Sequence, residues 1–430
     1  MRRIAGLLFF SLALPGTGRA GSFAAGADVS LPAVAVLPAA PQSMILSVPS
    51  GETLRLPSPL PAISNLPIEQ DSPASRAETP SPSPTVQTTR SIADARRPSS
   101  FEEIPPLDPR YMTPESRART VTIMGSSQSP EQIRAFILLA GRVAYELVKR
   151  GYNILTGCGK DGIMGAAYDA AVEAIRTLMQ SGAKTGENLA IVVTPAWRDE
   201  NLKDARAIGI ADSEPARVDK FHQASDTFII FPGGAYTLPE ATILVGKNRY
   251  SSPERRKRII LVGREWFTGL QIQYQKLYAD GTLGKNKDGT PITPEQLFIV
   301  VDTFEEILAA MPDSANLAEA AAKARAVSNS TDSGAPEPEK SAEGMAFPPE
   351  TVILYPDGEE SMQRALELIA LNRYQLHGPR KRLILFGKEF FEGLRIQYRK
   401  LFEDGTLGID PDELFQIVDS KEDILKNLPE

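Results

Sequence analysis

The stretch 227–240, TFIIFPGGAYTLPE, decides the fold class of this chain. Its apolar run 228–231 is too continuous for a strand with one face in water, so it predicts a strand buried on both faces of a parallel sheet. Gly233 and Gly234 follow, and glycine lets a backbone turn bring its N–H groups close to an anion at a helix N-terminus. Taken alone, the turn also fits an ordinary connection between a strand and a helix.

Short apolar runs alternate with helical patterns on both sides of this stretch. We expect strands at 121–124, 152–155, 189–194, 227–231, 258–262 and 298–301, and helices at 130–150, 164–179 and 304–311. Strands separated by helices imply right-handed crossovers, so the pattern predicts a Rossmann-like α/β fold with a doubly wound parallel sheet. Two glycine-rich turns, at 157–165 and 233–237, would then meet at the carboxyl ends of the strands, where such sheets bind ligands.

Composition limits the chemistry. A length of 430 residues could hold two or three domains, and an apolar content of 42% is ample for a core. The net charge of −7 argues against a nucleic-acid partner. The single cysteine, Cys158, excludes an internal disulfide. The presence of only two histidines, His222 and His377, argues against a histidine-ligated metal and a Ser-His-Asp triad. We expect no metal and no cofactor, with chemistry that rests on Arg, Asp, Glu and backbone amides. We expect His222 to pack over the helix before strand 227–231 rather than face the crevice.

The N-terminal region has the pattern of a targeting segment. Residues 1–25 combine two arginines, a short apolar run and a small-x-small site, as in a secretory signal peptide, which predicts a periplasmic or extracellular protein without membrane contact after cleavage. An uncleaved membrane tether, an organelle presequence and a cytoplasmic location are the alternatives. Residues 26–112 are rich in Pro, Ser, Thr and Ala and predict a disordered tether, and 315–346 predict a linker. A domain at 113–314 and a segment at 347–430 remain.

The last segment repeats part of this domain. Residues 351–408 match 227–284 at a constant offset of 124, with NRY against NRY and FTGLQIQYQKLYADGTLG against FEGLRIQYRKLFEDGTLG. The polar positions of the glycine turn differ, since Gly233, Tyr236 and Glu240 correspond to Asp357, Glu360 and Arg364, and acids there would repel a phosphate. Half a sheet exposes an edge and an apolar face. We expect it either to dock on the first domain as an internal pseudo-partner or to lengthen the first sheet.

Four motifs in order resemble one family. GSS at 125–127, GCGKDGIMGA at 157–166, an arginine before strand 227–231, and PGGAYTLPE at 232–240 resemble the signature of the LONELY GUY (LOG) phosphoribohydrolases. The resemblance covers residues 119 to about 311. It implies a Rossmann-like fold and cleavage of the N-glycosidic bond of nucleoside 5′-monophosphates, cytokinin ribotides included, to a free base and ribose 5-phosphate. It also implies dimers, either homodimers or a pseudo-dimer through 347–430.

The same resemblance assigns roles to residues. It implies that Arg217 and Glu240 are catalytic, because a carboxylate stabilises an oxocarbenium-like sugar while water attacks and a guanidinium holds oxygens in a fork. Taken alone, Arg217 also fits a solvated helix surface and Glu240 a charge at a helix N-terminus. The residues implied to bind substrate or phosphate are Gly125, Ser126, Gly157, Gly159, Gly162, Gly165, Gly233, Gly234 and Thr237.

Three positions depart from the family pattern. Tyr236 replaces a glycine, and we expect it to need a conformation that glycine adopts more cheaply. Val218 replaces a basic residue, and Cys158 stands in the middle of the first glycine motif, where it fits a small buried filler or a thiolate near a helix start. A catalytically silent nucleotide-binding or scaffold protein of the same fold is therefore the alternative to the enzyme.

Overall fold

The structure is a computed structural model that describes residues 106–312 and 351–427, apart from residues 158, 184, 194–203 and 377, together with residue 322. The predicted signal peptide, almost all of the predicted tether and linker, Cys158 and His377 lie outside the described residues. No helix in the described part of the chain is both long and apolar enough to cross a membrane.

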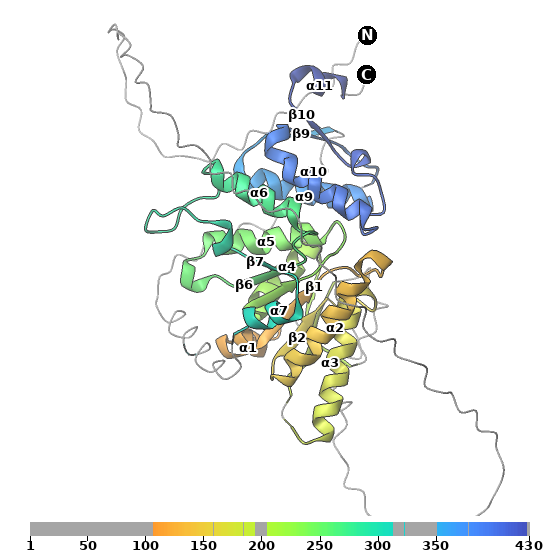
Figure 1. Ribbon diagram of the computed structural model, residues 1–430, viewed down its shortest axis with the longest axis vertical. Coiled ribbons are helices and arrows are strands. Elements are labelled where there is room, and N and C mark those ends of the chain that lie inside the picture. Colours follow the sequence, from red (N-terminus) through yellow and green to blue (C-terminus); the bar gives the residue numbers. More distant parts are fainter. Residues whose placement is uncertain are drawn as a thin grey trace, which may run out of the picture. The chain divides into compact units, whose positions relative to one another are not determined.

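Seven parallel strands form the main sheet in the order β4-β3-β2-β1-β5-β6-β7, which confirms the predicted α/β fold (Figure 1). The strands are β1 (Thr120–Met124), β2 (Asn153–Thr156), β3 (Asn188–Val193), β4 (Arg206–Ala211), β5 (Thr227–Ile230), β6 (Arg258–Val262) and β7 (Ile299–Val301). The chain runs outward from β1 to β4 and then returns to place β5 on the other side of β1. The carboxyl ends of β1 and β5 therefore meet at the switch point of the sheet, the usual ligand site of such folds.

Helices cover both faces of this sheet. One face packs on α2 (Arg134–Lys149), α3 (Gly162–Gln180) and α7 (Phe304–Ala310), and the other on α4 (Glu214–Ala224), α5 (Thr237–Tyr250) and α6 (Thr268–Ala279); the short α1 (Pro114–Arg119) precedes β1. Residues of β5 alternate between the two cores, since Ile229 lies in the first and Phe228 and Ile230 in the second. The predicted burial of this strand on both faces is confirmed.

Strand β4 and the segment before residue 113 were not predicted as parts of the domain. Strand β4 has a glycine between its two isoleucines, and it lies at the edge of the sheet, so the apolar run that marks a buried strand is missing. The segment before residue 113, predicted as tether, packs on the domain from Leu107 onward. Leu107 pairs with Gly209 of β4, and the buried Tyr111 donates its hydroxyl proton to Glu187 at 2.5 Å. The folded part therefore begins earlier than predicted.

The C-terminal half-repeat forms a separate sheet of three parallel strands in the order β10-β9-β8. Its elements are β8 (Thr351–Leu354), α9 (Gly358–Tyr374), β9 (Arg382–Phe386), α10 (Lys388–Glu403), β10 (Gln416–Val418) and α11 (Lys421–Lys426). The expectation that this segment lengthens the first sheet is wrong, because its strands pair only with one another among the described residues.

Helices α6 and α10 lie side by side (Figure 1). A Cβ atom built at Gly269 would lie 2.3 Å from the carbonyl oxygen of Gly393, and one built at Gly393 would lie 2.5 Å from the carbonyl oxygen of Gly269. Gln273 Nε2 donates to the Phe390 carbonyl at 2.6 Å, and its counterpart Gln397 donates to the Trp266 carbonyl at 2.6 Å. Each contact therefore occurs twice, and in the second copy each residue is replaced by the one at the equivalent position of the other repeat. Such reciprocal contacts are the geometry of a twofold interface.

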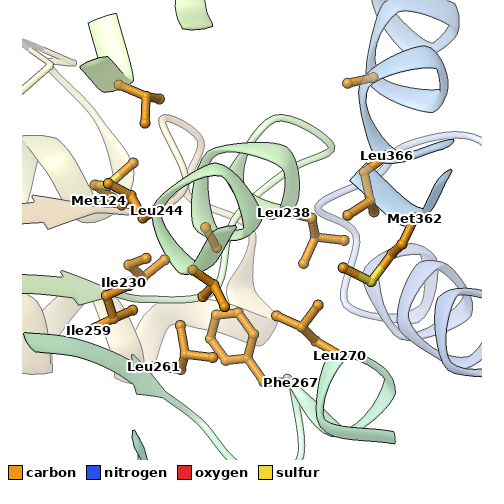
Figure 2. Packing of buried hydrophobic residues seen from close by; sticks show 14 of the residues in the cluster. Met124, Ile230, Leu238, Leu244, Ile259, Leu261, Phe267, Leu270, Met362 and Leu366 are labelled. Carbon is orange, nitrogen blue, oxygen red and sulfur yellow. The ribbon is translucent and has the colours of Figure 1, made fainter. Parts of the chain in front are cut away.

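A single apolar cluster joins the main domain to the half-repeat. Leu238 of α5 and Leu270 of α6 lie beside Met362 and Leu366 of α9, and the cluster continues to the strands of the main sheet (Figure 2). All four side chains are fully buried. Apolar burial of this kind stabilises the packing of the half-repeat on helices α5 and α6.

Candidate functional site

The turns after β1 and β5 touch each other at the switch point. The backbone N–H of Ser126 donates to the Pro232 carbonyl at 3.0 Å. A Cβ atom at Gly233 would lie 2.9 Å from the nitrogen of Ser126 and 2.0 Å from Thr237 Oγ1, so only glycine allows this approach. The structure thus brings the predicted site residues of the turn after β1 together with those of the turn before α5.

The turn after β2 joins them through Arg217. A Cβ atom at Gly157 would lie 2.7 Å from Arg217 Nη1, so the guanidinium packs directly on this turn. Arg217 lies in the first turns of α4, whose start is set by Ser213, with its side-chain oxygen accepting from the Ala216 N–H at 3.3 Å, and by Pro215. The glycine turn after β2 therefore lies directly against this arginine, which pairs with Glu240 in the first turn of α5.

Arg217 pairs with two carboxylates. Its Nη2 lies 3.1 Å from Glu240 Oε1 and 2.5 Å from Glu214 Oε2. The exposed fractions of the three side chains are 12% for Arg217, 9% for Glu240 and 17% for Glu214. The interpretation of Arg217 as a solvated residue on a helix surface is therefore wrong. Glu240 lies at the start of α5, but it is buried and paired with Arg217.

Burial controls the ionisation of Glu240. Loss of solvent raises its pKa to about 7, the nearby Arg217 opposes this shift, and the negative charge of Glu214 adds to it. A carboxyl group that changes charge near neutral pH is suited to acid–base work or to the stabilisation of a developing cation.

Of the other glycines in the motif at 157–165, Gly162 packs the start of α3 against the turn after β1, whereas Gly159 and Gly165 pack within the motif itself. The N–H of Gly162 donates to Ser129 Oγ at 3.0 Å, and a Cβ atom there would lie 2.3 Å from the Ser126 carbonyl oxygen. A Cβ atom at Gly165 would lie 2.0 Å from the Lys160 carbonyl oxygen, and one at Gly159 would lie 2.8 Å from Met164 Cε. These residues have a packing role, and their contact with a phosphate stays a prediction.

Tyr236 adopts an ordinary conformation. Its φ of −80° and ψ of −28° lie in the right-handed helical region, so the expectation that this position needs a glycine-like backbone is wrong. Its ring stacks on Tyr374 of α9, with the centroids 4.9 Å apart and an angle of 13° between the planes. The phenol ring of Tyr236 is thus packed against the half-repeat.

Val218 and His222 lie outside this group. Val218 is fully buried in the core under α4. His222 stacks on Phe228 of β5, with the ring centroids 6.5 Å apart. Burial and the positive charge of Lys257 lower the pKa of His222 to about 2, so its imidazole is neutral.

Three residues near the site were missed. Glu214 could have been found, because it precedes Arg217 by three positions at a marked helix start. The half-repeat supplies Tyr374 and Thr406, since a Cβ atom at Gly234 would lie 3.1 Å from the Tyr374 hydroxyl and 3.3 Å from the Thr406 carbonyl. Tyr374 lies in the repeated NRY tripeptide and Thr406 in the repeated DGTLG stretch, but neither repeat reveals which residues it contacts.

No protein-family model matches the chain, and no curated protein matches it either.

Proposed function

We propose that this protein hydrolyses the N-glycosidic bond of nucleoside 5′-monophosphates, as the LOG-like motifs imply. The observation that carries the proposal is the buried pair of Arg217 and Glu240, 3.1 Å apart at the switch point and next to two glycine-rich turns. A cation and an acid at this place match the needs of a bond whose cleavage builds positive charge on a sugar that carries a phosphate.

The residues divide the chemistry as follows. As the bond between C1′ and the base nitrogen breaks, the ionised carboxylate of Glu240 stabilises the oxocarbenium-like sugar. Water adds its hydroxyl to C1′, and the base leaves with the proton that the water gives up. Arg217 orients sugar or phosphate oxygens through its planar fork, while Glu214 fixes the guanidinium at 2.5 Å.

The phosphate would bind at the start of α5. Gly233 and Gly234 let the backbone N–H groups approach an anion, and the N-terminus of the helix favours negative charge. Thr237 adds a hydroxyl, and it is nearly fully buried beside Ser126. The backbone N–H groups and the Thr237 hydroxyl would donate hydrogen bonds to the phosphate oxygens, so this binding mode does not need a metal ion.

The test is a product assay. Full-length protein is incubated with AMP and with isopentenyl-AMP, and free base and ribose 5-phosphate are separated and quantified. We expect release by the wild type and a loss of at least about a hundredfold in Glu240→Gln, since this removes a charge that acts in the transition state. The matched control, Glu131→Gln, changes a glutamate with 79% of its side chain exposed and should retain full activity. Absence of product with both nucleotides contradicts the proposal.

A second candidate is a binding protein without turnover. The observation that favours it is the saturation of Arg217 by two carboxylates, which leaves less of the guanidinium for a ligand. The expected export of the chain points the same way, because 5′-nucleotides are scarcer outside the cytosol. Thermal stabilisation by AMP without release of base would identify the binder.

A further inference from the structure

The two halves differ at one pair of equivalent positions. Glu359 of the half-repeat corresponds to Ala235 of the intact turn. The Glu359 carboxylate is 2% exposed, and two residues of the main domain hold it: Arg249 Nη1 at 2.8 Å and the Tyr274 hydroxyl at 2.9 Å. The degenerate turn therefore contains an anion of its own, ligated from across the interface.

The twofold relation between the reciprocal contacts predicts that the repeats of these two ligands lie opposite Ala235. They are Arg373 and Tyr398, each 124 residues after its counterpart. The same relation is visible in the neighbouring contacts. Tyr374 stacks on Tyr236, and their counterparts, Tyr250 and Glu360, are hydrogen-bonded. By this relation, an arginine and a tyrosine of the half-repeat are expected to face a turn that has only a methyl group where the other turn has a carboxylate.

These two groups have no anionic partner within the part of the chain that the structure describes. Tyr398 is fully buried, and its hydroxyl makes no hydrogen bond with any described residue. Arg373 donates from Nε to the Leu407 carbonyl and its guanidinium lies 5.3 Å from the ring centroid of Tyr374, but it forms no ion pair with a described carboxylate. A buried hydroxyl without an acceptor is costly in a folded protein.

We propose that the intact turn has an oxyanion-binding subsite at Ala235, ligated by Arg373 and Tyr398 of the half-repeat. The oxyanion takes the place that the Glu359 carboxylate holds in the equivalent turn. Its chemistry is that of a phosphate, free or carried by a nucleotide. Binding at this subsite does not depend on cleavage of a glycosidic bond, so it can be tested independently of the proposed hydrolase activity.

The first test is calorimetric titration of the full chain with inorganic phosphate. We expect saturable binding that weakens at least about tenfold in Arg373→Ala, because a charge-assisted hydrogen bond is lost. Tyr398→Phe should weaken binding by a smaller factor. The control is Arg395→Ala, an arginine with 58% of its side chain exposed that pairs with Glu392 on the same helix; it should bind like the wild type. Binding that is absent, or unchanged in Arg373→Ala, overturns the proposal and leaves a buried water as the partner of Tyr398.

Competition identifies the source of the anion. Adenosine should not displace phosphate. If AMP displaces inorganic phosphate, the 5′-phosphate of a nucleotide occupies the subsite. If AMP and inorganic phosphate bind together, the ligand of the subsite is a free oxyanion. In either result, weaker phosphate binding in Arg373→Ala supports the subsite. Phosphate binding with this mutant response but without release of base would sustain the subsite while rejecting the hydrolase.

The second test installs the missing carboxylate. Ala235→Glu should fold, keep a thermal midpoint at or above that of the wild type, and lose phosphate binding, because the new side chain takes the anion's place. The matched control is Ala144→Glu, another fully buried alanine, which faces an apolar core and should lower the midpoint strongly. A comparable loss of stability in both variants, or phosphate binding retained in Ala235→Glu, contradicts the proposal.

Discussion

Glu240 and Glu359 are both buried carboxylates paired with an arginine, yet their surroundings differ. Glu359 receives hydrogen bonds from Arg249 and Tyr274, and the second acid beside Arg249, Glu360, has 60% of its side chain exposed to solvent. Glu240 shares Arg217 with Glu214, so its negative charge is less well compensated. The first arrangement holds the half-repeat in place, and the second leaves an acid ready to change its charge.

Removal of Glu359 should destabilise the protein. Glu359→Ala leaves Arg249 with the exposed Glu360 as its acidic partner and deprives the buried Tyr274 hydroxyl of its acceptor, so we expect the free energy of unfolding to fall by about 1–3 kcal/mol. Chemical denaturation followed by tryptophan fluorescence measures this change. Glu389→Ala is the control, because this glutamate is 87% exposed in its pair with Lys276 and should cost less than about 1 kcal/mol. Equal losses in the two variants would show that the buried pair adds no stability.

Glu240 should make stability depend on pH in a defined window. Its pKa rises from the ordinary value of 4.5 to about 7 on folding, so the folded state holds a proton that the unfolded chain has already lost between these values. The free energy of unfolding therefore falls as the pH rises through this window. We expect the thermal midpoint of the wild type to fall relative to that of Glu240→Gln between pH 4.5 and about 7, while Glu131→Gln follows the wild type. Parallel curves for the wild type and Glu240→Gln contradict this effect.

At the level of elements, the contact of α6 with α10 depends on two glycines. Gly393→Ala would place a Cβ atom 2.5 Å from the Gly269 carbonyl oxygen, so the helices must separate. We expect a loss of about 1–3 kcal/mol in the free energy of unfolding. Gly246→Ala is the control, since this helical glycine has no atom closer than 3.6 Å to a new Cβ, and it should gain up to about 1 kcal/mol from helix propensity. A stabilised Gly393→Ala would contradict the close packing.

Sequence patterns predict elements better than they predict contacts between them. The run at 228–231 indicates a strand buried on both faces because every residue is apolar, and the structure agrees. Strand β4 could not be predicted from an apolar run, because it lies at the sheet edge and Gly209 interrupts its apolar residues. The site shows the same limit. Motif order predicts that the glycine turns meet, whereas the approach of Tyr374 to Gly234 depends on a twofold packing that local sequence does not encode.

At the level of the whole molecule, we propose that the half-repeat takes the place of a second subunit. It covers α5 and α6 with reciprocal contacts, as a symmetric partner would. We expect the full chain to be monomeric in light scattering after size exclusion. A chain that ends at residue 314 exposes Leu238 and Leu270 and should dimerise or aggregate. A truncated chain that stays monomeric, soluble and equally stable contradicts this role.

We propose that one of the two related turns binds a nucleotide phosphate, while the other is closed by its own carboxylate. The most direct measurement is calorimetric titration of the full chain with AMP and with adenosine. We expect one AMP to bind per chain and adenosine to bind at least about tenfold more weakly, because the phosphate contacts are absent. No binding of AMP, equal affinity for adenosine, or two sites per chain would contradict it.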